Sequence, residues 1–305
     1  MWLILAFLSA TLLGCYDSFK KEALQGNAVI PVLFLNTLFS SLIFLPFILL
    51  SSTTHVLDES IFHVQSGGWE LHRYIVLKSL IVLSSWIFGY FGMKHLPLTI
   101  VGPINATRPV MVLIGAMLIF GERLNMYQWI GVGLAVISFF MLSRSGKKEG
   151  IDFKHDKWVY FIVAAAVLGA ISGLYDKYLM ASPSDGGVGL ECMMVQSWYN
   201  IYQCFLMGLM LILLWWPTRH KNTPFHWHWS IVFISVFLSA ADFVYFYSLS
   251  LEGAMISIVS MIRRGSVIVS FLFGALIFHE KNLKSKILDL CIVLLGMLFL
   301  YIGSK

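Results

Sequence analysis

The chain has 305 residues, of which 58% are hydrophobic and only 12% are charged, with a formal net charge of +5 and a mean hydropathy of +0.81. Soluble domains carry about 25% charged residues, so this composition excludes an ordinary soluble globular protein. The cations lie in short polar segments without a basic and aromatic nucleic-acid module, so no nucleic-acid partner is expected. The apolar runs are close to the length that spans a bilayer as a helix, and they neither alternate nor have the shorter length typical of barrel strands.

We predict ten transmembrane helices from these runs. The first half gives Trp2–Phe19, Val29–Leu50, Tyr74–Met93, Leu98–Phe120 and Met126–Leu142, and the second half gives Trp158–Met180, Glu191–Trp216, Ser230–Leu251, Ala254–Phe278 and Ser285–Ile302. A charged connector at residues 146–157 separates a first five-helix repeat, residues 1–145, from a second, residues 158–305.

Short motifs recur between the two halves. Leu-Ile-Phe-Gly-Glu-Arg at residues 118–123 returns as Leu-Ile-Phe-His-Glu-Lys at residues 276–281, which is 158 positions later, and Gly-Cys-Tyr-Asp at residues 14–17 returns as Gly-Leu-Tyr-Asp at residues 173–176. Because each half holds an odd number of helices, the second half must enter the membrane upside down. The prediction is an all-α membrane protein in which two inverted repeats surround a central cavity.

Three arginines lie near the middle of apolar runs, namely Arg108, Arg263 and Arg264. A charge at the bilayer centre costs about 2.5 to 3.5 kcal/mol on insertion scales and usually marks a binding site or pathway. We therefore predict that these arginines bind the anionic part of a substrate, with Asn105, Trp86 and Tyr245 completing the site.

Local sequence also predicts irregular backbone beside the arginines. Pro109 follows Arg108 and disfavours helix at the preceding residue, and Gly265 and Ser266 follow the arginine pair. Broken helices at this depth line cavities.

Asp242 lies midway along the eighth run and has two interpretations. It is either a titratable carrier that couples transport to a proton gradient or a permanent ion-pair partner of Arg108 or Arg264. The sequence leaves both open.

The repeated Tyr-Asp pairs, Tyr16 with Asp17 and Tyr175 with Asp176, lie near the ends of the first and sixth runs. Inversion would place them toward opposite faces, as two gates closed by Lys20, Lys177 or a neighbouring helix. Simple solvation of these carboxylates at the membrane surface is the alternative.

Gln196, Asn200 and Gln203 form one polar stripe on the seventh run. The stripe either lines the substrate cavity, which we favour, or joins helices by hydrogen bonds. Glu122 and Glu280 follow the fourth and ninth runs and are interpreted as helix caps.

The chain resembles the drug/metabolite transporter superfamily, in particular the EamA-type ten-helix exporters. The resemblance is carried by Phe-Gly-Glu-Arg-Leu at residues 120–124, its counterpart at residues 278–281, the Gly-Val-Gly helix start at residues 131–133, and Lys20. It implies a helical basket with a central cavity, alternating access, and efflux of amino acids, related metabolites or drugs across a bacterial inner membrane.

The resemblance also implies that both chain ends are cytoplasmic. The excess of lysine and arginine in the segments after odd-numbered runs points the other way. The sequence leaves the orientation open.

Together these features predict a secondary active transporter, an exporter of a small anionic or zwitterionic metabolite, with optional proton coupling. An uncoupled facilitator or channel is the alternative. No enzyme motif, cofactor or metal site is predicted, because the four cysteines (Cys15, Cys192, Cys204 and Cys291) lie inside apolar runs as small hydrophobic residues. The expected partners are a small-molecule substrate, the lipid bilayer and protons, and the sequence allows either a monomer or a homodimer.

Overall fold

A computed structural model describes residues 2–108, 110–112, 114–115, 125–147, 151, 153–180, 183, 186–220, 223–250, 262–279 and 283–303. These residues form helices and their connections, with no strand among them, which confirms the all-α prediction. The first half contains α1 (Trp2–Leu24), α2 (Val29–Thr53), α3 (Trp69–His95), α4 (Leu98–Ala106) and α6 (Met126–Lys147). The second half contains α7 (Lys157–Met180), α8 (Cys192–Met210) with the π-helical η2 (Leu211–Trp215) and α9 (Trp216–Thr218), then α10 (Ser230–Ser250), α12 (Ser266–Leu276) and α13 (Leu283–Gly303).

Several of these helices have the length and apolar composition of membrane spans. Four segments qualify by both criteria among the described residues, namely Val29–Thr53, Trp69–His95, Lys157–Met180 and Cys192–Thr218. Shorter apolar stretches lie at Met126–Ser138, Ser230–Tyr245 and Ile287–Gly303. The number of membrane crossings, ten in our prediction, stays a prediction.

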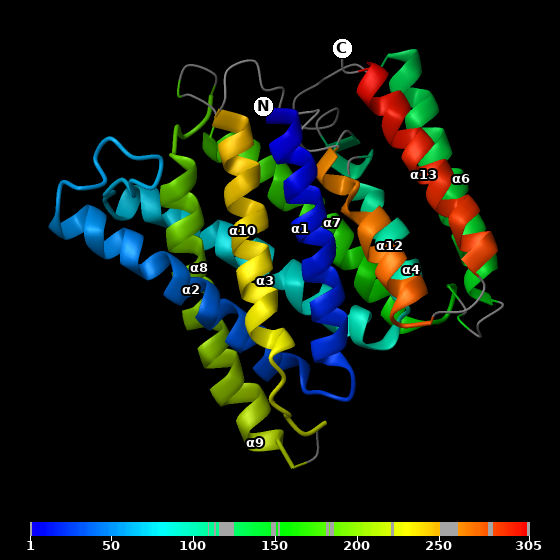
Figure 1. The fold of residues 1–305 in the computed structure, drawn as a ribbon, viewed down its shortest axis with the longest axis horizontal. Helices are drawn as coiled ribbons and strands as arrows, with labels where there is room; N and C mark the ends of the chain where they lie inside the picture. Colours follow the sequence, from blue (N-terminus) through cyan, green and yellow to red (C-terminus); the bar gives the residue numbers. More distant parts are fainter. Residues whose placement is uncertain are drawn as a thin grey trace.

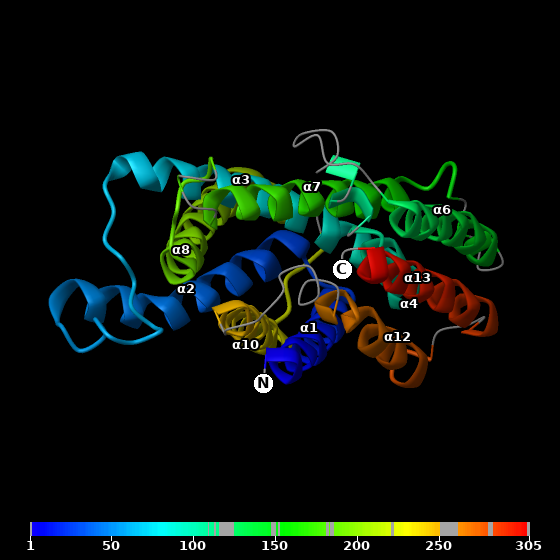
Figure 2. The ribbon, with the colours of Figure 1, turned by 90° about the horizontal axis from the view of Figure 1, so that it is seen from above.

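The most extensive helix contacts join one half of the chain to the other. α1 packs along α10, α3 along α7, α6 along α13, and α2 along α8 (Figures 1 and 2). α4 and α12 also touch each other, and each contacts a helix of the other half, α7 and α1 respectively. The two halves are therefore interleaved, so that a helix of one half has a helix of the other half as its main neighbour.

Two helix boundaries differ from the prediction in a way that matters for the site. α1 continues to Leu24, so Lys20 lies inside the helix instead of after it, and it is buried. α3 begins at Trp69, earlier than the predicted Tyr74, which places the buried Lys78 well inside the helix. The predicted boundaries were placed where polar residues interrupt the apolar runs. The helical hydrogen bonds of the backbone continue through these polar residues, so the helices are longer than the runs.

Two helices are interrupted at equivalent places in the two halves. α4 ends at Ala106, and Thr107 forms a turn whose hydroxyl donates to the carbonyl oxygen of Ile104 at 2.7 Å. α12 begins after a turn at Gly265, whose amide donates to the carbonyl oxygen of Ile262 at 2.8 Å. Thr107 and Gly265 are 158 positions apart, the spacing of the sequence repeat. The irregular backbone expected beside the arginines is therefore present on both sides, although Pro109 itself lies outside the described residues.

Glycines allow α12 to approach its neighbours closely. A Cβ atom at Gly14 of α1 would lie 2.4 Å from the Cβ of Val269, and one at Gly102 of α4 would lie 2.6 Å from Cγ2 of Val267. Neither contact leaves space for a side chain. The interrupted end of α12 is thereby held against both α1 and α4.

Candidate functional site

The three arginines predicted to form a site do converge. Arg108 follows the end of α4, and Arg263 and Arg264 precede α12, so the two helix interruptions carry them toward each other. Arg108 interacts electrostatically with Arg263 and Asp17, and Arg264 interacts with both other arginines. All three side chains are half-buried. This cluster of Arg108, Arg263 and Arg264 is called the arginine cluster below.

One member of the arginine cluster is neutralised by the central acid. Arg263 forms an ion pair with Asp242 of α10, and the two side chains are only 16% and 13% exposed. The Tyr199 hydroxyl donates to the other Asp242 oxygen at 3.3 Å, and the Arg263 guanidinium lies 4.3 Å from the centre of the Tyr245 ring. The ion-pair interpretation of Asp242, one of the two that the sequence leaves open, named Arg108 or Arg264, whereas the partner is Arg263. Residue spacing does not fix which side of a broken helix faces α10.

The other two members form no ion pair with a carboxylate in the described part of the chain. The ion pairs among the described residues use neither Arg108 nor Arg264, and Nε of Arg108 is buried without a hydrogen-bond partner. The Arg108 guanidinium lies directly on Gly169 of α7, where an added Cβ would be 2.8 Å from Cζ. Gly169 thus provides the space that Arg108 occupies.

The first Tyr-Asp pair lies beside this cluster. Asp17 forms an ion pair with Lys20 at 2.8 Å, and the Ser270 hydroxyl of α12 lies 3.3 Å from its other oxygen. The Lys20 ammonium lies 4.2 Å from the centre of the Tyr16 ring. The Asp17 carboxylate is 20% exposed and ion-paired, so it is not a freely solvated group, and its role as a gate stays a prediction.

The second Tyr-Asp pair is held differently. Asp176 of α7 forms an ion pair with Lys78 of α3, whose side chain is 5% exposed. The Tyr175 hydroxyl donates to the carbonyl oxygen of Tyr74 at 3.2 Å, a second link to α3. The side chain of Lys177, a predicted partner, lies outside the described residues.

Tyr199 connects the second Tyr-Asp pair to the central acid. Its ring lies 5.2 Å from the Lys78 ammonium, and its hydroxyl binds Asp242. A continuous series of charged and aromatic contacts therefore runs from Asp176 through Lys78 and Tyr199 to Asp242.

The predicted amide stripe is buried at a helix contact. Gln196, Asn200 and Gln203 of α8 are at most 2% exposed, and the Ser41 hydroxyl of α2 donates to the carbonyl oxygen of Asn200 at 2.8 Å. This geometry favours the helix-joining alternative over cavity lining. The side-chain oxygen and nitrogen of Gln196 and Gln203 lack partners among the described residues, so this contact is not fully satisfied.

Two further predicted residues make no polar contact with the arginine cluster in the part of the chain that the structure describes. Asn105 is in the last turn of α4, and its Oδ1 is buried without a partner in the described part of the chain. Trp86 of α3 is partly buried against the main apolar core. The predicted caps Glu122 and Glu280 lie outside the described residues.

Sequence reasoning missed two contacts of the site and one buried acid on α13. Lys78 and Gly169 were missed as contacts of Asp176 and Arg108. Asp289 of α13 is 1% exposed and has an Oδ2 atom with no partner among the described residues. The sequence contained a sign of each residue's importance. Lys78 and Asp289 are charged residues inside apolar runs, and Gly169 lies on the same face of α7 as Asp176, seven residues earlier.

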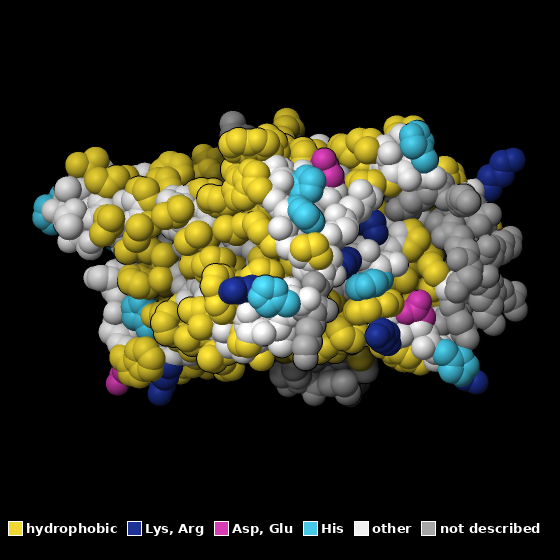
Figure 3. Space-filling model, turned by 90° about the horizontal axis from the view of Figure 1, so that it is seen from below, with side chains coloured by type: hydrophobic (Ala, Val, Ile, Leu, Met, Phe, Trp, Pro, Cys, Tyr) yellow, Lys and Arg dark blue, Asp and Glu magenta, His cyan; other side chains and the backbone are white. Residues whose placement is uncertain are grey.

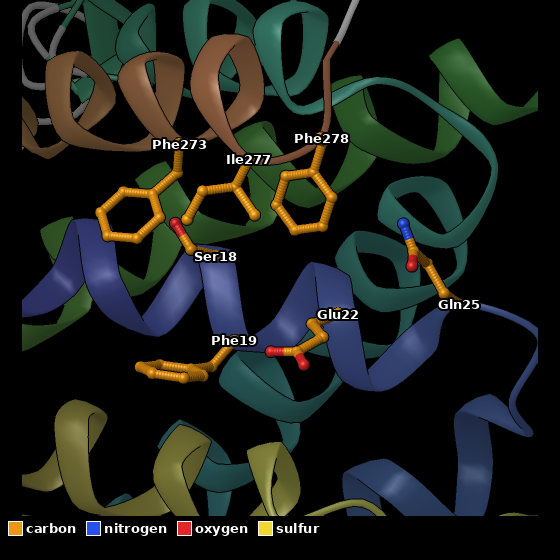
Figure 4. Close-up of a pocket in the computed structure, with 7 residues that line it drawn as sticks. All are labelled: Ser18, Phe19, Glu22, Gln25, Phe273, Ile277 and Phe278. Carbon is orange, nitrogen blue, oxygen red and sulfur yellow. The ribbon is translucent and has the colours of Figure 1, made fainter.

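A pocket of about 510 Å³ lies between α1 and the end of α12. Figure 4 shows Phe19 and Glu22 on α1 and Phe273, Ile277 and Phe278 on the other wall; Ser18 and Gln25 complete the lining. Ser18 adjoins Asp17, so the pocket begins beside the first Tyr-Asp pair, but the arginines do not line it. On the underside of the molecule, Lys, Arg and His side chains gather among apolar ones (Figure 3).

Comparisons with known proteins agree with this architecture. A probable 4-amino-4-deoxy-L-arabinose-phosphoundecaprenol flippase subunit ArnE from Aeromonas salmonicida (strain A449) is 31% identical over 74 residues, which are 24% of this chain and 60% of that relative. A solved crystal structure covers 97% of this chain and 94% of its own with a TM-score of 0.62 at 14% identity, a likeness of fold alone. The EamA-like transporter family matches residues 1–144 and again residues 156–302. The chain therefore belongs to the EamA-like transporter family and is an integral membrane protein of a transporter fold.

Proposed function

We propose that this protein is a secondary active transporter that exports a small anionic or zwitterionic metabolite by alternating access. The observation that carries the proposal is the convergence of Arg108, Arg263 and Arg264 at two helix interruptions that lie at the same position of each repeat. Interrupted helices that carry polar groups are the usual substrate sites of such transporters. We place the protein in a bacterial inner membrane, as its family resemblance implies.

Opposed directions of equivalent helices support an inverted repeat. The start of α6 meets the end of α13, where the Asn125 side chain donates to the carbonyl oxygen of Gly303, and Ser138 donates to the carbonyl oxygen of Asp289 further along. α2 and α8 are also antiparallel, because Ser41 contacts Asn200 while Phe34 lies beside Gly208.

Exchange of the halves also preserves the pattern of helix contacts. The contact of α1 with α10 becomes that of α7 with α3, and the contact of α1 with α12 becomes that of α7 with α4. A pattern that maps onto itself supports a two-fold relation about the arginine cluster, as two alternative openings around one site require.

Charge in the centre selects the substrate. Asp242 neutralises Arg263, and the remaining positive charge needs an anion whenever water is excluded, because isolated buried charges are strongly disfavoured. The ion pairs Asp17–Lys20 and Asp176–Lys78 are proposed as the closures of the two entrances.

Flux into liposomes tests this function. Purified protein would be assayed with a panel of labelled organic acids and amino acids, and Arg108→Ala and Arg264→Ala are expected to abolish the flux of any transported anion. The exposed Arg73, replaced by Ala, is the matched control for loss of one arginine. Full flux in both cluster variants would overturn the assignment of the site.

An uncoupled facilitator is the second candidate, and one contact favours it. Asp242 already forms an ion pair with Arg263 and accepts a hydrogen bond from Tyr199, as its interpretation as a permanent ion-pair partner requires. Flux that responds neither to a pH gradient nor to Asp242→Asn would establish the facilitator, whereas loss of gradient-driven accumulation in Asp242→Asn would establish coupling.

A further inference from the structure

We propose that the arginine cluster binds a dianionic phosphoryl group, the recognised part of the transported molecule. This inference deepens the proposed function and rests on it. It narrows the substrate from any small anion or zwitterion to molecules that carry a phosphate monoester or an equivalent doubly charged phosphoryl group.

The charges of the arginine cluster, Asp242 and the two Tyr-Asp ion pairs leave two positive charges unpaired in the part of the chain that the structure describes. Five cations belong to the arginine cluster and the two Tyr-Asp ion pairs, and three of them are paired: Lys20 with Asp17, Lys78 with Asp176, and Arg263 with Asp242. Arg108 and Arg264 form no ion pair among the described residues, and Arg264 interacts with Arg108 as a like charge. A ligand with two negative charges would neutralise this pair, whereas a zwitterion adds a cation and leaves the excess unchanged.

The side-chain chemistry selects phosphoryl oxygens. A guanidinium presents several N–H donors in a planar fork that matches phosphate and carboxylate groups in two-point contacts. Two guanidiniums that approach from the two interrupted helices can share one compact group with three terminal oxygens. Nε of Arg108 is buried without a partner among the described residues, so a phosphoryl oxygen at this atom would satisfy a donor that otherwise lacks a hydrogen bond.

The position of Arg108 is fixed before any ligand arrives. Its guanidinium rests on Gly169, which leaves no space for another side chain, so the donors are already held in place. Because these donors are already in place, the arginine side chain loses less conformational entropy when a ligand binds, and the affinity rises accordingly.

Two sources could supply the phosphoryl group. One is a water-soluble phosphate monoester. The other is a lipid-linked phosphate, for which the apolar wall of Phe273, Ile277 and Phe278 beside α1 offers a place for the chain. The curated relative is named as a flippase subunit for an arabinose derivative on phosphoundecaprenol. The phosphoryl chemistry is common to both.

A matched pair of small ligands tests the charge. Methyl phosphate and methyl sulfate have nearly the same shape, but only the phosphate gains a second charge, with a pKa of about 6. In thermal-shift titrations of purified protein, the concentration of methyl phosphate for half-maximal stabilisation is expected to fall about tenfold from pH 5 to pH 7.5, as its dianionic fraction rises. Methyl sulfate reports any titration of the charged groups around the cluster, Asp17, Lys20 and Asp242 included, and is expected to bind weakly at every pH.

Variants assign the binding to the two arginines. Arg108→Gln and Arg264→Gln are each expected to weaken methyl phosphate binding by about tenfold or more and to remove the preference over methyl sulfate. Arg73→Gln is the control. If a glutamine variant fails to fold, the corresponding lysine variant keeps the charge and is expected to bind less tightly than wild type.

Separate arms distinguish the sources and the possible failures. The lipid-linked source would be identified by two results. Undecaprenyl phosphate would compete with methyl phosphate for binding, and Phe278→Ser would weaken the binding of undecaprenyl phosphate but not that of methyl phosphate. Equal binding of methyl phosphate and methyl sulfate, or no binding of methyl phosphate and undecaprenyl phosphate, would overturn the inference. Arginine-dependent flux of a monoanion in the same preparation would leave the proposed function standing.

Discussion

The two Tyr-Asp motifs have nearly the same sequence but are held by different kinds of ion pair. Asp17 pairs with Lys20 on its own helix, three residues away, whereas Asp176 pairs with Lys78 on another helix. The first pair can persist when α1 moves as a unit. The second must break if α3 and α7 separate. A duplicated motif has therefore produced one ion pair that travels with its helix and one that joins two helices.

The largest expected effect comes from removing the lysine of the second motif. Lys78→Met leaves Asp176, whose side chain is 30% exposed, without its cation and is expected to lower the free energy of unfolding by about 2 kcal/mol. Lys20→Met is expected to lower it by about 1 kcal/mol, because Asp17 keeps Ser270 and lies near Arg108. Chemical unfolding in one detergent would measure both.

A double variant provides the control for this difference. Lys78→Met with Asp176→Asn removes the orphaned charge and is expected to recover much of the lost stability. Equal losses in Lys78→Met and Lys20→Met would contradict the distinction between the two ion pairs.

A second expected effect concerns the space for Arg108, which exists in only one half. Gly169 of α7 corresponds to Ala10 of α1 in the repeat, and only the glycine leaves room for a guanidinium. Gly169→Ala is expected to lower transport about tenfold, equivalent to about 1.4 kcal/mol, by displacing Arg108.

Gly133→Ala is the matched control, since a Cβ at this helical glycine meets nothing within 4 Å. It is expected to leave flux unchanged and to raise the melting temperature slightly, because alanine favours helix. A loss of flux equal to that of Gly169→Ala would show that the arginine contact is not responsible.

Tyr199→Phe tests the connection between the second motif and the central acid. It keeps the ring beside Lys78 and removes the hydroxyl that binds Asp242, with an expected loss of about 1 kcal/mol. A double-mutant cycle with Asp242→Asn would detect this interaction as a coupling energy, and additive effects would argue against the connection.

The smallest expected effect is at the helix α12 contact of the first motif. Ser270→Ala removes one hydroxyl near Asp17 at 3.3 Å, and we expect about 0.5 kcal/mol of destabilisation because Lys20 remains paired. The same unfolding assay applies. A loss as large as that of Lys78→Met would reverse the ranking of the two motifs.

Much of the fold could be predicted because it depends on local composition. Long apolar runs become helices, and the residues around Pro109 and Gly265 do interrupt helices in both halves. Partner choice could not be predicted, since the helical period gives the face of a helix but not the neighbour that it meets. For that reason the ion-pair interpretation of Asp242 named Arg108 or Arg264 and not Arg263, and Lys78 was not recognised as the partner of Asp176.

The amide stripe shows the same limit from the opposite direction. Gln196, Asn200 and Gln203 were correctly placed on one face of a helix, but only the position of α2 shows that this face is covered. A polar stripe is compatible with a wet cavity or with a dry helix contact until the neighbouring helix is known.

The interleaving of helices has a consequence for the integrity of the chain. Each of α1, α2, α3 and α6 makes its most extensive contact with a helix from the other half. Most of the buried helix surface of each half is therefore covered by the other half. A polypeptide cleaved in the connector at residues 146–157 would still be a single assembly, because each fragment supplies what the other lacks. Either fragment produced alone would expose those faces to lipid or to a second copy of itself, and we expect it to be degraded by cellular proteases.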